Sequence, residues 1–173
     1  MRILLSVLIY FIAFLTVQAQ TTNPYAKAIK EQADLMGQAI LQSNYNAFIK
    51  YTHPKVVEKL GGKEQMLADM ESSINQMKAE GAEISSVKFG DPTGLISTNS
   101  DLQCILPQKL EIKVTGGRLV ANSTLVAVSK DKGKTWHFID YAGMDIKALQ
   151  QVVPEISEKL VLPVQQQPVF IED

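Results

Sequence analysis

Residues 101–114 read DLQCILPQKLEIKV, and the alternation of apolar and polar side chains in this stretch decides the fold class. An apolar side chain at every second position is the pattern of a half-buried β-strand. Pro107 leaves two arrangements open, one long strand or two strands joined by a bend, because proline cannot donate a ladder hydrogen bond. The alternating apolar residues are Leu102, Cys104, Leu106, Leu110, Ile112 and Val114.

The sequence on both sides of this stretch predicts further antiparallel strands. Gly116-Gly117 predicts a tight hairpin, after which residues 119–129 return as a strand. Residues 135–141 predict the last strand. On the N-terminal side, residues 84–89 predict a first strand and residues 91–94 predict a turn. The strands should therefore form an antiparallel meander.

The N-terminal part of the chain predicts helices. Asn23 is expected to cap the first helix, whose apolar residues recur at three- and four-residue spacing. Asn44 should cap a shorter helix, Thr52-His53-Pro54 breaks the chain, and Gly81 should end the last N-terminal helix in the left-handed conformation. Residues 145–152 predict a closing helix. The sequence thus predicts an α+β fold, with N-terminal helices packed on one face of a curved antiparallel sheet and a short C-terminal helix.

The first 19 residues (1–19) indicate a signal peptide. Arg2 is followed by an apolar run over residues 3–17 and by the small residue Ala19, as a signal-peptidase site requires. A membrane-spanning helix needs about 20 apolar residues, so this shorter run is expected to be removed. The mature chain is therefore expected to be exported, periplasmic or secreted, without a membrane anchor. No lipid anchor is expected, because no cysteine stands directly after the cleavage point.

The mature chain is long enough for one domain. Residues 20–162 are expected to form this domain, and residues 163–173 an extended tail. The formal net charge of the full chain is −1, and such a nearly neutral protein is not expected to bind nucleic acid. Cys104 is the sole cysteine, so no intramolecular disulfide is possible, and it is expected to be a small buried apolar residue.

Residues 129–136 read SKDKGKTW, which resembles the Asp-box pattern S-x-D-x-G-x-T-W of sialidases and other secreted glycan-handling proteins. Sialidase chemistry needs several arginines, whereas the mature chain has only Arg118 and lacks the repeats of a propeller. A structural hairpin is therefore favoured. The alternative, a glycan-associated module, requires Trp136 to be exposed beside Asp131. The residues expected to build the structural hairpin are Ser129, Asp131, Gly133 and Thr135.

Residues 39–62 read AILQSNYNAFIKYTHPKVVEKLGG and resemble the nuclear transport factor 2-like superfamily, which includes ketosteroid isomerases and polyketide cyclases of the SnoaL type. The resemblance implies a cystatin-like, cone-shaped sheet with a pocket between the sheet and the first helix, and it makes a homodimer an expected assembly. In this alignment Lys59 occupies the position of the catalytic base, and Met36 that of a tyrosine. Neither side chain can perform that role, so a non-catalytic protein is favoured.

Four residues are candidates for the lining of that pocket: Tyr51, His53, Trp136 and Asp140. His53 and Asp140 are also the catalytic candidates, because a neutral imidazole can act as a base near pH 7 and a carboxyl group among aromatic side chains can have a raised pKa. The even-numbered residues of strand 135–141 share the face of Asp140, and the sequence leaves open whether that face lines the pocket. No cofactor is expected, and no metal site either, because the two histidines have no acidic cluster at ligand spacing.

The favoured function is an exported, non-catalytic domain that binds a small apolar or amphipathic ligand, or a partner protein, in the pocket between the sheet and the first helix. Met66, Met70 and Met77 would give such a pocket a pliable lining. The first alternative is a small exported isomerase, cyclase or hydrolase that uses His53 and Asp140. The second alternative is the glycan-associated module.

Overall fold

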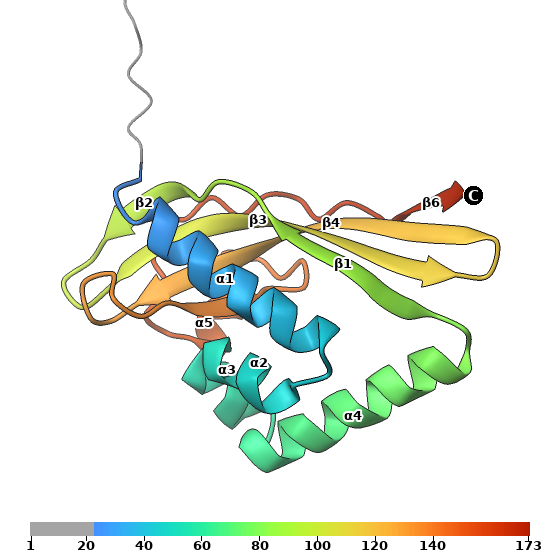
Figure 1. The fold of residues 1–173 in the computed structure, drawn as a ribbon. Coiled ribbons are helices and arrows are strands. Elements are labelled where there is room, and N and C mark those ends of the chain that lie inside the picture. The colour runs from blue at the N-terminus through green and yellow to red at the C-terminus, as the bar shows by residue number, and fades with distance from the viewer. Residues whose placement is uncertain (1–22) are drawn as a thin grey trace, which may run out of the picture.

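The computed structural model describes residues 23–173, so the expected signal peptide and its cleavage site lie outside the described residues. Helices are followed by a curved, unclosed antiparallel sheet with a short helix beside it, which confirms the predicted α+β fold (Figure 1). No helix within residues 23–173 is long and apolar enough to cross a membrane. The elements are α1 (Ala26–Leu41), α2 (Tyr45–Tyr51), α3 (Pro54–Lys59), α4 (Lys63–Ala79), β1 (Glu83–Phe89), β2 (Thr93–Ser97), β3 (Leu102–Val114), β4 (Gly117–Ser129), β5 (His137–Asp140), α5 (Ile146–Val152) and β6 (Val169–Glu172).

Local capping groups explain where the N-terminal helices begin and end. At the start of α2, the side-chain oxygen of Asn44 accepts a hydrogen bond from the N–H of Ala47 at 3.1 Å, as predicted. Gly81 follows α4 with a φ of +79°, also as predicted. The cap predicted for α1 is wrong, because Tyr25 is the cap residue and makes no side-chain cap bond. Asn23 instead accepts a hydrogen bond from the N–H of Tyr25 at 2.9 Å, in a turn before the helix.

Strand β3 is the centre of the sheet and continues through Pro107, so residues 102–114 form one long strand. It pairs with β4 from Leu102, opposite Ser129, to Val114. Strands β1 and β2 pair with the other edge of β3. Strands β5 and β6 pair with the outer edge of β4. The long β3–β4 hairpin therefore carries all the other strands (Figure 1).

Two predicted features of the sheet are wrong. Thr93 and Gly94 already belong to β2, so the turn expected over residues 91–94 ends earlier. The strand expected over residues 135–141 spans only residues 137–140, because the preceding residues belong to the hairpin loop. It is also not the last strand, since β6 follows it.

Side chains fill both faces of the sheet near β5. Helix α1 packs on one face, and α5 with the segment after it packs on the other. The space between the sheet and α1, where a pocket was expected, is therefore occupied by buried side chains. The core on the α1 face contains Ile29, Ala33, Met36, Cys104, Leu106, Leu125, Ala127, Trp136 and Phe138. The core on the α5 face contains Ile105, Val126, Val128, Ile139, Tyr141, Leu149, Val153, Ile156 and Leu160.

The C-terminal tail returns to the sheet and ends in β6, a strand that was not predicted. Strands β5 and β6 pair with the two ends of the outer edge of β4 and leave residues 121–124 without a neighbouring strand there, within the described part of the chain. Residues 163–168 connect to β6 without regular secondary structure. A Cβ atom at Gly117 would collide with the carbonyl oxygen of Ile171, so glycine at this position allows β6 to approach.

Candidate functional site

One carboxylate holds the hairpin loop between β4 and β5. The Oδ1 atom of Asp131 accepts hydrogen bonds from the Ser129 hydroxyl at 2.9 Å and from the N–H groups of Lys134 and Thr135 at 3.1 and 2.8 Å. Bonds from Thr135 and Ser129 lower the pKa of Asp131 to about 2. The Ser129 hydroxyl accepts a bond from the N–H of Gly133 at 2.9 Å, and Gly133 has a φ of +84°. The four residues expected to build a structural hairpin thus all take part in this loop.

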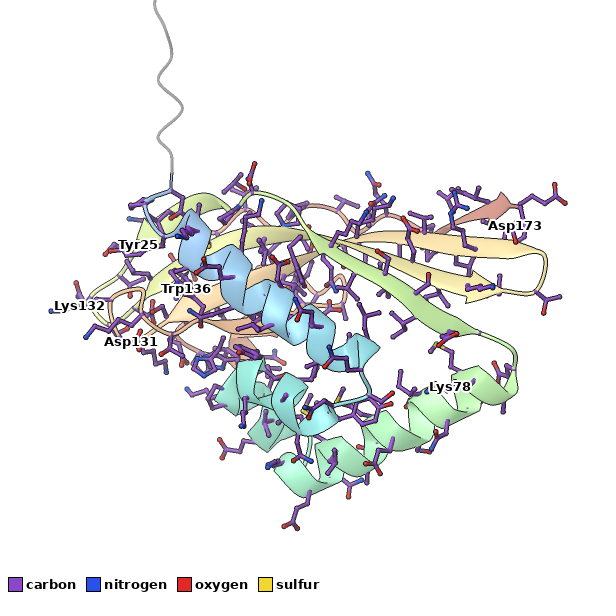
Figure 2. The ribbon with its side chains drawn as sticks, in the orientation of Figure 1. Tyr25, Lys78, Asp131, Lys132, Trp136 and Asp173 are labelled. Atoms are coloured by element: carbon purple, nitrogen blue, oxygen red, sulfur yellow. The ribbon has the colours of Figure 1, made fainter. Side chains whose placement is uncertain are left out.

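Trp136 lies under the hairpin rather than on its surface (Figure 2). Its side chain is 0% exposed, and its Nε1 donates a hydrogen bond to the carbonyl oxygen of Gly133 at 3.0 Å. The ring of Tyr25 packs beside the indole at a centroid distance of 5.9 Å. The side chain of Gln32 on α1 binds the N–H of Trp136 at 2.8 Å and the carbonyl oxygen of Lys134 at 3.0 Å. The hairpin is therefore fastened to α1, and the buried Trp136 gives the glycan-associated alternative no support.

His53 is buried, with 2% of its surface exposed, and caps the start of α3. Its Nδ1 accepts a hydrogen bond from the N–H of Lys55 at 3.3 Å, so the neutral ring carries its proton on Nε2, which lies 4.0 Å from Glu155 Oε1. Burial lowers the pKa of His53 to about 4, although the Glu155 carboxylate acts in the opposite direction. The neutral ring has no free lone pair to accept a proton from a substrate. The geometry therefore does not support a catalytic base at His53.

A polar cluster around Glu155 was not predicted from the sequence. The carboxylate pairs with Lys55 Nζ at 2.8 Å and with Lys130 Nζ at 2.6 Å. Burial raises the pKa of Glu155, but the bonds from Lys130 and Lys55 outweigh this effect and lower it to about 2. Gln103 Nε2 also donates a hydrogen bond to the Glu155 carbonyl oxygen at 2.7 Å. The cluster joins α3, the hairpin and the segment after α5, so it stabilises the fold.

The other candidate residues have structural surroundings as well. Asp140 is exposed, and its Oδ1 accepts a hydrogen bond from the N–H of Ala142 at 2.9 Å in the turn after β5. Tyr51 is half-buried against the core on the α1 face. Burial raises the pKa of the Cys104 thiol to about 12, so the thiol is protonated at neutral pH and is not a nucleophile.

Two surface hollows adjoin each other along the C-terminal tail. Their volumes are about 370 and about 490 Å³, within the range of small-molecule sites. The residues expected to line a pocket, Tyr51, His53, Trp136 and Asp140, line neither hollow. The residues that line both hollows are Tyr141, Pro163, Val164 and Gln165.

The two hollows differ in chemistry. The floor of the first hollow crosses β1, β3 and β4 and includes two lysines, Lys88 and Lys109, beside Asn122 and Thr124. The tyrosine hydroxyl of Tyr141 donates a hydrogen bond to the carbonyl oxygen of Pro163 at 2.5 Å and fixes the tail between the hollows. The second hollow is lined by a larger number of apolar side chains, together with Asp145, Tyr141 and Gln165. Its apolar side chains include Met144, Ile146, Leu160, Leu162 and Val164.

A third hollow, of about 250 Å³, lies beside α4. Met66 and Met70 line it, together with Ile40 and Leu60, whereas Met77 lines another small hollow. Met66 and Met70 therefore lie at a surface hollow beside α4. Met77 lies at a hollow of only about 20 Å³, which Leu41 of α1 and Ile84 of β1 also line. No group of three or more His, Cys, Asp or Glu side chains within residues 23–173 is placed to hold a metal ion.

Comparison with known proteins gives little further information. No protein-family model matches the chain, and no curated protein matches it. Among solved structures, the chain is similar to a crystal structure of TerC co-crystallized with polyporic acid, at 10% sequence identity and a TM-score of 0.30. That similarity covers 72% of this chain and 97% of the other chain. Similarity at this level carries no argument about function.

Proposed function

We propose that the protein is an exported, non-catalytic domain of the nuclear transport factor 2-like type that binds an apolar or amphipathic ligand. The observation that carries this proposal is the pair of adjoining hollows along residues 163–165, one with Lys88 and Lys109 in its lining and the other with a group of apolar side chains around Ile146. This site differs from the pocket expected between the sheet and α1, because side chains of the core fill that space. The enzyme alternative has no comparable support, since His53 lacks a free lone pair and Asp140 is exposed.

A neutral apolar dye, Nile red, tests whether the apolar hollow binds ligands. Ile146→Asp should abolish the fluorescence gain of the dye, because it places a charge in the apolar hollow. Val161→Asp is the matched control: Val161 is 78% exposed and is not among the residues that line the hollow, so this variant should bind the dye normally. Circular dichroism establishes that both variants are folded. Absence of dye binding by the parent protein, or equal binding by both variants, would contradict the proposal.

Mass spectrometry of native protein purified from its own host addresses the natural ligand. A retained small molecule that is displaced by excess dye would support the proposed site. Size-exclusion chromatography with light scattering on the same sample tests the homodimer that the superfamily resemblance implies. Export is tested separately, by determining whether the N-terminus of the secreted or periplasmic protein begins at Gln20.

A further inference from the structure

The first hollow lies on the face of the sheet that is turned away from α1. A Cβ atom placed on Gly37 of α1 would lie 3.3 Å from the side chain of Val87 and 3.1 Å from that of Phe89, so these two residues of β1 face the helix. Because side chains alternate along a strand, Lys88 points to the opposite face. Lys88 pairs with Lys109 on β3, and Lys109 pairs with Asn122 on β4, so these three residues form one row across the sheet.

The two lysines of this row place like charges directly opposite each other on neighbouring strands. Such a pair is unfavourable for sheet pairing unless an anion compensates it. Glu111 forms an ion pair with Lys109 at 2.7 Å, and the pKa of Glu111 is lowered by this bond and by the charges of Arg118 and Lys88. Lys109 contacts this carboxylate, while Arg118 and Lys88 act on it through their charges. The floor of the first hollow keeps an excess of positive charge that a ligand anion can neutralise.

Neutral polar groups stand next to these lysines. Thr124 and Asn122 line the same hollow, and their side chains donate and accept hydrogen bonds. Two further lining residues are small: Pro107, which pairs with Thr124 on the neighbouring strand, and Gly90. Neither has a long side chain that would fill the hollow. The first hollow therefore suits a compact acidic group.

The second hollow begins where the first one ends. Tyr141 and the tail residues Pro163 and Gln165 belong to both, so one ligand can contact both sets of side chains. On the far side of the tail the lining includes the aliphatic side chains of Ile146 and Leu162. It also includes Asp145, whose carboxylate accepts a hydrogen bond from the N–H of Ala148 at 2.8 Å. Burial of aliphatic ligand surface there is favourable, because apolar area is removed from water.

We infer that the ligand is an anionic single-chain amphiphile, with its acidic head group at Lys88 and Lys109 and its hydrocarbon chain in the hollow lined by Ile146 and Leu162. This inference rests on the proposed function and adds the chemical class of the ligand. A carboxylate and a phosphate monoester share the required chemistry, because both present anionic oxygens to ammonium groups.

The test uses isothermal titration calorimetry of the mature protein with four probes of equal chain length, each below its micellar concentration: dodecanoate, dodecyl phosphate, dodecanol and dodecyltrimethylammonium. The anionic probes should bind at least about tenfold more tightly than dodecanol, and the cationic probe most weakly. The relative affinities of dodecanoate and dodecyl phosphate identify the preferred head group. The preference for anions should decrease with salt, because the lysines are exposed.

The double variant Lys88→Gln/Lys109→Gln should bind the anionic probes about tenfold more weakly and dodecanol unchanged. The control Lys113→Gln/Lys132→Gln removes the same charge from residues outside the hollow and should retain the affinity. If dodecanol binds as tightly as dodecanoate, or if both double variants behave alike, the head-group assignment is wrong while the proposed apolar site remains. If none of the probes binds, and Nile red does not bind either, the proposed function is wrong as well.

Discussion

The stability of the protein should fall between pH 6.5 and pH 4 because His53 is buried as a neutral ring. In the unfolded chain this histidine has a pKa of 6.5, whereas burial lowers the pKa to about 4 in the folded protein. Between these two pH values the His53 ring binds a proton in the unfolded chain but not in the folded protein. The contribution of His53 to the free energy of unfolding is therefore fully present above pH 6.5 and is lost as the pH falls. From the difference between the two pKa values, the free energy of unfolding should be about 3 kcal/mol lower at pH 4 than at neutral pH. About 2 kcal/mol of this loss is already reached at pH 5.

The variant His53→Asn isolates this effect. Asparagine keeps a side-chain acceptor at the start of α3 but does not titrate. The free energy of unfolding that is lost between pH 7 and pH 5 should therefore be about 2 kcal/mol smaller in the variant than in the parent protein. The measurement is urea unfolding followed by the fluorescence of Trp136, the single tryptophan, at pH 7, 6 and 5. Glu155 does not interfere, because its pKa is lowered from 4.5 to about 2 and its contribution is lost only below pH 4.5.

His137 provides the matched control, because burial also lowers its pKa and it lies 6.3 Å from His53 between ring centroids. The variant His137→Asn should retain the pH dependence that comes from His53. The reasoning would be refuted if His53→Asn and the parent protein lost the same stability between pH 7 and pH 5. Direct titration of the His53 ring by nuclear magnetic resonance should then show a pKa near its ordinary value.

Three further substitutions test the contacts that hold the fold together. Gly133→Ala should lower the free energy of unfolding by at least about 2 kcal/mol in thermal or urea unfolding, because φ is +84° and a Cβ would collide with Tyr25. Gly117→Ala should release β6 from Ile171 onward, measured as fast amide exchange in β6 with the exchange in the core unchanged. Glu155→Gln should cost about 1–2 kcal/mol at pH 7 and less at pH 2, because the two partly exposed lysines lose their anion in this variant.

The α+β fold could be predicted because its signals are local. The alternation in residues 101–114 and the turn at Gly116 together define the long hairpin to which all the other strands attach. Asn44 and Gly81 act on backbone groups within a few residues, so their roles as helix caps are readable from the sequence. The tail strand was missed because its four residues are exposed and do not alternate in burial, so only the open edge of β4 explains its position.

The surroundings of the candidate site residues could not be predicted, because they depend on contacts between distant segments. Glu155 meets Lys55 from 100 residues away, and this cluster also fixes the environment of His53. The sequence could not show whether Trp136 would be buried or exposed. In the fold, the ring of Tyr25 and helix α1 cover it. The two adjoining hollows along the tail likewise depend on contacts between the tail and the sheet.

The two adjoining hollows lie where the core that covers one face of the sheet, formed with α5 and the segment after it, ends. On the face turned away from α1, β3 presents Ile105 to the core under α5, then Pro107, and then Lys109 to solvent. The change from apolar to charged residues takes place at Pro107, and the tail crosses the sheet there. Such a boundary places aliphatic and cationic side chains next to each other. A ligand that satisfies both must carry a charge at one end only, so an amphiphile fits this boundary better than a purely apolar compound.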